Sequence, residues 1–202
     1  MMPSRHPQTG HYKINMGRNR EISNSEIEKL LDDANYLIDE AEALKYVIDA
    51  VPYDETPPDG ESIIDMLRLI NFAQKEYYRP VSERVFSENR LVKLNEITHF
   101  KKAYQDHDEE KERDIQKVLS KIIKNRAALL IFFNRITVID WERILKDQFG
   151  TQITLYDFAV EMVKEERGLL KNIADLVMIY QNELHNQREI NRKISQRKLS
   201  DD

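Results

Sequence analysis

The stretch DWERILKDQFGTQITLYDFAVEMVKEERGLLKNI, residues 140–173, decides the fold expected of this chain. It contains the only tryptophan, Trp141, followed by Gly150, a helix-stop signal, and Thr154, a helix-start signal. Thr154 and Asp157 have the spacing of a capping box, in which two side chains satisfy free backbone N–H groups of a first helical turn. Apolar residues then recur every three or four positions, so we predict a long amphipathic helix from Thr154 to Tyr180. For residues 140–150 we expect one or two helical turns that end at Gly150.

Three more helices are expected upstream of this stretch. Apolar stripes at helical spacing predict one helix that starts at Asn24 or Ser25 and fades near Ala50, one that begins after Ser62, and one at 108–136. Capping boxes are expected at Ser25 with Glu28 and at Ser62 with Asp65. Pro80 is expected to kink or end the second helix, because proline lacks the backbone N–H and clashes one turn back. Residues 82–106 predict a short helix or an irregular connection.

The whole chain fits an all-α fold. Only 5 of its 202 residues are glycine and 6 are proline, which is too few turn residues for an all-β sandwich. Four long amphipathic helices without a strand signal predict a four-helix bundle, and the long links around the third helix imply long inter-helix connections. We expect a mobile arm at 1–21, the bundle domain at 22–180, and a polar helical extension at 181–202.

The extension has sparse apolar residues at Leu184, Ile190 and Ile194. Two interpretations remain open for it: a helix that continues into solvent, or a contact with a second copy of the chain in a homodimer.

Charge, hydropathy and cysteine content limit which partners and which cellular location we expect for the protein. The formal net charge is -5, but residues 1–20 carry four bases and no acid, whereas residues 21–76 carry 15 acids and 4 bases. No basic stripe with interleaved aromatics follows the arm, so we expect no nucleic-acid partner. No run approaches the ~20 apolar residues that span a bilayer, so we expect no membrane partner. The absence of cysteine and of a secretory signal favours a cytoplasmic location.

The sequence offers little catalytic chemistry. The five histidines, His6, His11, His99, His107 and His185, include no pair three or four residues apart, so no helix face presents a metal-binding pair. There is no cysteine nucleophile, no nucleophile elbow and no glycine-rich phosphate loop. Glu165 interrupts the apolar face of the fourth helix, and burying its charge would cost several kcal/mol unless an arginine or hydroxyl groups compensate. Arg68 and Arg143 are the possible arginine partners. Glu165 at the solvent edge of the helix is the simpler interpretation.

Two stretches resemble the DinB-like superfamily of four-helix bundles, which includes metal-dependent hydrolases and thiol-dependent S-transferases. In PPDGESIIDMLRLINFAQKEY (57–77), the Ser62, Asp65 and 67–70 positions are similar to the family's loop and second helix, although Glu61 replaces a tryptophan. In 140–173 the matching positions are Trp141, Arg143, Gly150, Thr154, Leu155, Leu170, Asn172 and Ile173. The resemblance implies the DinB-like bundle over roughly residues 25–180.

The family's three metal-binding histidines correspond to Leu69, Glu165 and Leu169, or to Arg68 if the first frame slips by one. None of these is a histidine, and two leucines with one glutamate cannot make a three-ligand site. We therefore expect no metal and no other cofactor. A low-polarity pocket between the second and fourth helices is the candidate binding site, with residues Arg68, Leu69, Trp141, Arg143, Glu165 and Leu169.

The sequence therefore favours a non-catalytic protein that binds an apolar small molecule or a protein partner. The alternatives are a divergent metal-independent transferase or hydrolase with Glu165 as general base, and a structural homodimer joined through the C-terminal helix.

Overall fold

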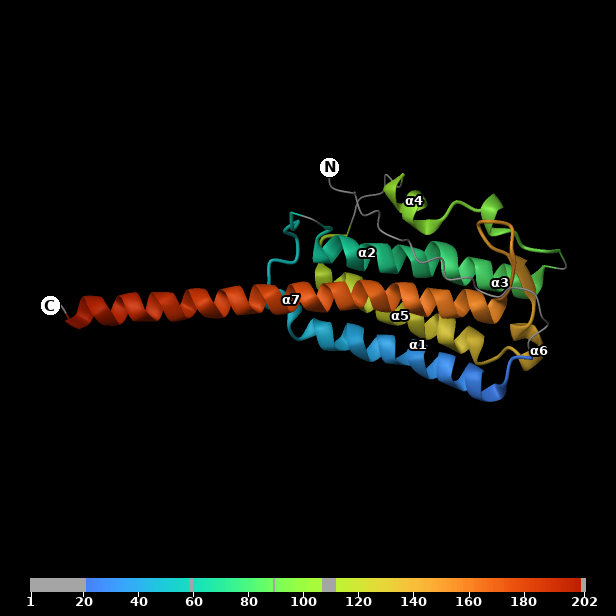
Figure 1. Cartoon of the computed structure of the whole chain (residues 1–202), viewed down its shortest axis with the longest axis horizontal. Coiled ribbons are helices and arrows are strands. Elements are labelled where there is room, and N and C mark those ends of the chain that lie inside the picture. Colours follow the sequence, from blue (N-terminus) through green and yellow to red (C-terminus); the bar gives the residue numbers. More distant parts are fainter. Residues whose placement is uncertain (1–20, 59, 89, 107–111, 201–202) are drawn as a thin grey trace, which may run out of the picture.

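The structure, a computed structural model, describes residues 21–58, 60–88, 90–106 and 112–200, and it is an all-α four-helix bundle as predicted (Figure 1). Apart from Glu21, the predicted N-terminal arm lies outside these residues. So do Asp201 and Asp202, at the end of the predicted extension.

The first helix, α1 (Asn24–Lys45), begins at Asn24 as predicted, but its cap is Ser23 and not the predicted Ser25. Ser23 and Glu26 form the capping box, with the Glu26 N–H donating to Ser23 Oγ at 3.3 Å and the Ser23 N–H donating to Glu26 Oε2 at 3.1 Å. Ile22 and Ile27, which flank this cap, are both buried. Such a pair is a hydrophobic staple, and it selects Ser23 over Ser25 as the cap. A short 3-10 turn, η1 (Ile48–Ala50), follows α1.

The second rod of the bundle passes through Pro80 without ending, which corrects the prediction that a helix ends there. It consists of α2 (Ile63–Ala73), a π-helical turn η2 (Gln74–Tyr78) and α3 (Arg79–Ser87). The predicted Ser62 cap is confirmed, because the Asp65 N–H donates to Ser62 Oγ at 3.2 Å. The wide π turn lies immediately before the proline and gives its ring room beside the preceding backbone.

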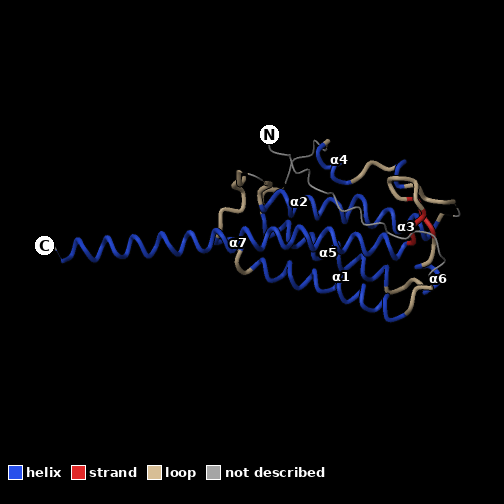
Figure 2. The backbone as a smooth tube through the Cα atoms, in the orientation of Figure 1, coloured by secondary structure: helices blue, strands red, loops and turns tan. Residues whose placement is uncertain are grey.

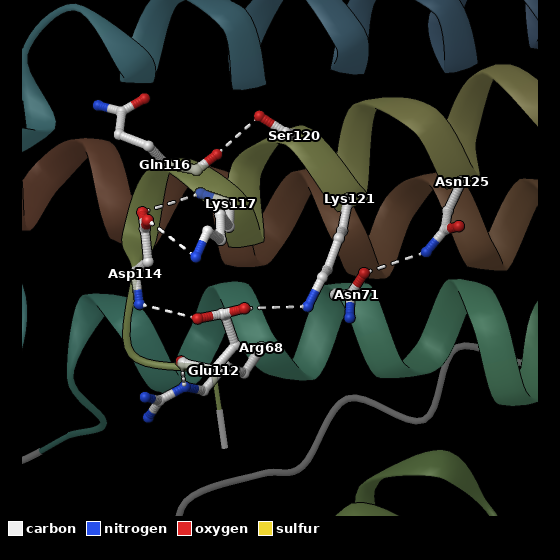
Figure 3. Close-up of polar contacts among 9 residues, drawn as sticks. All are labelled: Arg68, Asn71, Glu112, Asp114, Gln116, Lys117, Ser120, Lys121 and Asn125. Carbon is white, nitrogen blue, oxygen red and sulfur yellow. Dashed lines mark hydrogen bonds and ion pairs between the residues drawn. The ribbon is translucent and has the colours of Figure 1, made fainter. Parts of the chain in front are cut away.

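A long connection leads to the third rod. It contains a 3-10 turn, η3 (Leu94–Glu96), and a short helix, α4 (Phe100–Gln105). Helix α5 (Ile115–Phe133) begins after Asp114, whose side chain accepts from the Lys117 N–H at 3.1 Å. The predicted start at Asp108 is therefore wrong: residues 112–114 are not helical, and 107–111 lie outside the described residues. Figure 3 shows this cap and the contact across to α2, where Asn125 donates to the Asn71 side chain at 3.0 Å.

The segment before the last helix is a hairpin rather than the predicted helical turns. After α6 (Val138–Trp141), strand β1 (Ile144–Lys146) pairs antiparallel with β2 (Gln152–Thr154). Leu145 in β1 is fully buried, and Gly150 in the turn has φ +81°, a conformation that suits glycine. The sequence signal at Gly150 was thus a turn between strands. Thr154 and Asp157 form the predicted capping box, with hydrogen bonds of 3.0 and 3.1 Å.

The four rods pack with α1 and α2 at opposite corners. Helix α1 contacts α5 and α7 (Leu155–Ser200), and α2 contacts the same two helices. Figure 2 shows the hairpin at one end of the bundle, and Figure 1 shows α7 continuing far beyond the other end. The core between the rods is made of aliphatic and aromatic side chains from all four. Within the described ranges, no helix is both long and apolar enough to cross a membrane.

Candidate functional site

Among the predicted site residues, Glu165 on α7 is a partly exposed carboxylate. The Tyr78 hydroxyl donates to Glu165 Oε2 at 3.0 Å, and Lys101 Nζ lies 3.5 Å from Glu165 Oε1. The Glu165 side chain is 33% exposed. Its charge is therefore held at the edge of the bundle by a phenol and a cation, as the simpler interpretation of the sequence expected.

Aromatic rings form the floor beneath Glu165. Tyr77 and Tyr78 from η2 pack against Phe100 of α4 and Phe158 of α7, with ring centroids 5.4 to 6.0 Å apart. The His99 ring lies 5.4 Å from that of Tyr77. Contacts of this kind add to the stabilisation that burial alone provides. They hold the Tyr78 hydroxyl rigidly under the Glu165 carboxylate.

Burial also sets the protonation of this cluster. It raises the pKa of Tyr78, and the nearby negative charge of Glu165 raises it further. Burial lowers the pKa of His99, against the opposing effect of Glu165. Near neutral pH the phenol therefore keeps its proton and acts as a hydrogen-bond donor, while a neutral imidazole is favoured.

The next residue, Glu166, is the acid that the bundle buries. Glu166 and Arg126 of α5 form an ion pair in which the two side chains are 3% and 1% exposed. Gln74 Nε2 of η2 donates to Glu166 Oε2 at 3.2 Å. Arg126 Nη1 also lies 3.6 Å from Met162 Sδ. Burial lowers the pKa of Arg126 to about 9, so the guanidinium remains charged at neutral pH.

Three inward-facing polar or aromatic side chains come from the π turn η2: Gln74, Tyr77 and Tyr78. Their spacing of three and four residues places all three on one side of the rod. All three are buried. Extra-wide turns of this kind are frequent at functional sites. Here the turn places Gln74 on Glu166 and Tyr78 on Glu165.

The predicted charge partners of Glu165 bind elsewhere. Arg68 Nη1 contacts Asp65 Oδ1 at 2.9 Å, and its Nε donates to the Glu112 carbonyl at 2.8 Å (Figure 3). Arg143 Nε donates to Asp140 Oδ1 at 2.9 Å, and its Nη1 to the Phe86 carbonyl at 2.6 Å. Neither arginine therefore compensates Glu165. The sequence did not predict Tyr78 and Lys101 in that role.

The other predicted site residues do not gather around Glu165. Leu69 is buried in α2, nine residues before Tyr78, which corresponds to roughly 13 Å along a helix axis. Leu169 is partly buried against the core. Trp141 is 1% exposed, with its ring centroid 4.9 Å from that of Phe133. The structure thus spreads these residues over two regions of the bundle.

Two clefts border the core, each of about 170 Å³. One includes Trp141, Phe133, Ile27 and Leu31, and it lies between α1, α5 and α6. The other includes Gln74, Arg79 and Asn125 beside the π turn. Glu165 lines neither of them. Among the described residues, no three His, Asp or Glu side chains are grouped so that they could hold a metal ion.

Sequence reasoning missed the buried pair. Glu166 lies four residues from both Met162 and Leu170, so helical spacing already places it on the buried face of α7, whereas Glu165 lies 100° away around the helix. Arg126 was also not identified from the sequence, because its neighbours on α5 follow the expected apolar stripe. A usable signal was present: Arg126 lies one turn from Ile122, Leu129 and Leu130, all buried residues.

Comparisons with known proteins support the fold. No family model and no curated protein sequence matches the chain. Among solved structures, the chain is similar to YfiT from Bacillus subtilis, described as a probable metal-dependent hydrolase with an unusual four-helix bundle topology. The TM-score is 0.64 at 15% identity, and the match covers 81% of this chain and 93% of that chain. At this identity the likeness shows the fold alone, a four-helix bundle.

Proposed function

We propose that this protein is a non-catalytic interaction protein, in which the bundle is a rigid base and the projecting end of α7 binds a partner. The observation that carries this proposal is the length of α7, which runs 46 residues. Val177 is the last buried residue among its described side chains. The helix beyond it leaves the bundle as a single rod (Figure 1).

A single rod of this composition supports a binding role. Tertiary packing of an apolar face supplies most of the stability of helices in proteins, and the rod beyond Val177 has no buried residue among its described side chains. Ile190 and Ile194 lie on the rod with exposed fractions of 56% and 48%. They offer a partner an apolar face that the bundle itself does not cover.

The residues at 69, 165 and 169, which correspond to the metal-binding positions of the DinB-like family, support the proposal that the protein is non-catalytic. Leucine side chains at 69 and 169 have no donor atom for a metal ion. Glu165, the third position, is already engaged by Tyr78 and Lys101. An apolar small molecule remains a second ligand class, and the cleft beside Trp141 is where it would bind.

One observation favours the catalytic alternative. Glu165 is partly exposed and has two titratable groups, Tyr78 and Lys101, within 3.5 Å. A carboxylate with a neighbouring proton donor can act as a general base. In that alternative Glu165 would take the proton from a substrate, and Tyr78 would hold the carboxylate in position.

Two measurements test the proposal. In the first, tag-free protein is dialysed against zinc, nickel and manganese ions, and we expect no stoichiometric binding of metal. A metal that binds to the wild-type protein but not to Glu165→Gln would refute the proposal that the protein is non-catalytic. A chain that ends at Tyr180 should keep the bundle's thermal midpoint. If this truncation unfolds the bundle, the extension is part of the domain's own stability, and the role as partner-binding element is wrong.

A further inference from the structure

The projecting part of α7 carries a pattern that indicates what binds it. Val177, Leu184 and Asn191 are seven residues apart, and so are Tyr180, Gln187 and Ile194. These are the a and d positions of a heptad repeat, the seam of a coiled coil. Val177 and Tyr180 pack on the bundle core. The seam is therefore continuous with the core, and its free part begins at Leu184.

We infer that this seam pairs with the same segment of a second copy of the chain, in an antiparallel two-helix arrangement. The inference rests on the proposed function, and it names the partner. A two-fold axis beside residue 189 places Leu184 opposite Ile194 of the other copy and Gln187 opposite its Asn191. In an antiparallel coiled coil, an a residue faces a d residue, so the layers are apolar with apolar and amide with amide. The two Ile190 side chains meet near the axis.

Charge decides the direction of pairing. Residues 188–198 carry five bases and one acid. The bundle end that α7 leaves is acidic: the connection between α1 and α2 has exposed carboxylates at Asp49, Asp54, Glu55 and Glu61. Figure 1 shows that connection beside the exit of α7. Antiparallel pairing lays each basic segment beside the acidic end of the other bundle, whereas parallel pairing would lay the two basic segments side by side.

Exposed apolar side chains gather at the same end. Tyr46, at the end of α1, is 90% exposed, and Met178 and Ile179 on α7 are 57% and 48% exposed. A second helix that arrives beside this end would cover part of this surface. Arg188 is the one unfavourable element, because antiparallel pairing brings its two copies near the axis.

The absence of cysteine makes a direct test practical. Leu184→Cys and Ile194→Cys chains are oxidised separately and as a mixture, with Asn182→Cys, on the outer side of the rod, as the matched control. The inference expects an intermolecular disulfide only in the mixture of the 184 and 194 variants. A disulfide in Leu184→Cys alone would show parallel pairing and overturn it.

Arg188→Gln provides a second, independent readout by sedimentation over a range of protein concentrations. In the antiparallel dimer, Arg188→Gln removes the repulsion between the two copies of Arg188 and tightens association several-fold. In a parallel dimer, the same substitution removes the ion pair between Arg188 and Glu183 of the other copy and weakens association. Glu189→Gln, on the outer face, should change the dissociation constant less. Raising the salt concentration should weaken the wild-type dimer. A wild-type chain that sediments as a monomer at every concentration would overturn the inference, while the metal and truncation tests of the proposed function would be unaffected.

Discussion

Removing one partner of the buried Arg126–Glu166 pair should destabilise the bundle more than most single substitutions. Both side chains are at most 3% exposed, so Arg126→Met would leave the Glu166 carboxylate buried with Gln74 as its remaining donor. Breaking a buried pair in this way costs about 3–5 kcal/mol. For a chain of this size, that loss lowers the thermal midpoint by about 6–20 °C. Urea unfolding followed by circular dichroism measures the change in the free energy of unfolding.

The double replacement separates two explanations of that loss. Arg126→Met with Glu166→Leu removes both charges and leaves side chains of similar volume, so we expect stability to return to within about 1 kcal/mol of wild type or to exceed it. The pair is also incompletely bonded, since Gln74 Oε1 and Glu166 Oε1 have no hydrogen-bond partner among the described residues. A single variant that loses less than about 1 kcal/mol would refute the reasoning. So would a double variant as unstable as the sum of the two singles.

Three further predictions concern backbone and titration. Gly150→Ala should lower the free energy of unfolding by about 1 kcal/mol, because Gly150 has φ +81°. Gly168→Ala, in the exposed middle of α7, should raise it by up to about 1 kcal/mol. Neither added methyl group meets an atom within 4 Å, so thermal melts of the two variants compare backbone effects alone. Burial raises the pKa of Tyr104 to about 12 and also raises the pKa of Tyr78, so the stability that the two protonated phenols contribute is full below pH 10 and is lost as the pH rises toward 12. Phenolate absorbance should show that these two tyrosines ionise at higher pH than the others. Titration of all tyrosines together near pH 10 would contradict this prediction. Burial lowers the pKa of His99, so the stability that the neutral imidazole contributes is present above pH 6.5 and is lost as the pH falls. A proton NMR titration that gives His99 a pKa above 6.5 would refute this prediction.

Caps and stripes were the features that the sequence predicted well. Ser62 with Asp65 and Thr154 with Asp157 cap helices in the structure as they do in the prediction, because a capping box depends on residues only three positions apart. The cap of α1 was misplaced by two residues. Two serines were available there, and the burial of Ile22 and Ile27, the two positions that flank the Ser23 cap, decides between them.

The candidate site was harder to predict. The sequence drew attention to the neighbourhood of Glu165, and the structure does place a polar cluster there with Tyr78 and Lys101. It also places Leu69 and Trp141 away from that cluster, because Leu69 lies nine residues before Tyr78 and Trp141 packs against Phe133. Helical spacing from Met162 and Leu170 places Glu166, and not Glu165, on the buried face of α7. The pairing of Glu166 with Arg126 depends on what the facing helix α5 offers.

By itself, the sequence determined the helical class, the four rods, two of the caps and the absence of histidine at positions 69, 165 and 169. These follow from local spacing and from side-chain chemistry. Only the tertiary structure decided that Pro80 lies inside a continuous rod, that residues 144–154 form a hairpin, and that Glu166 pairs with Arg126. Each of these depends on contacts between residues far apart in the chain, because the free energy of burying a charge or pairing two strands is set by the partner.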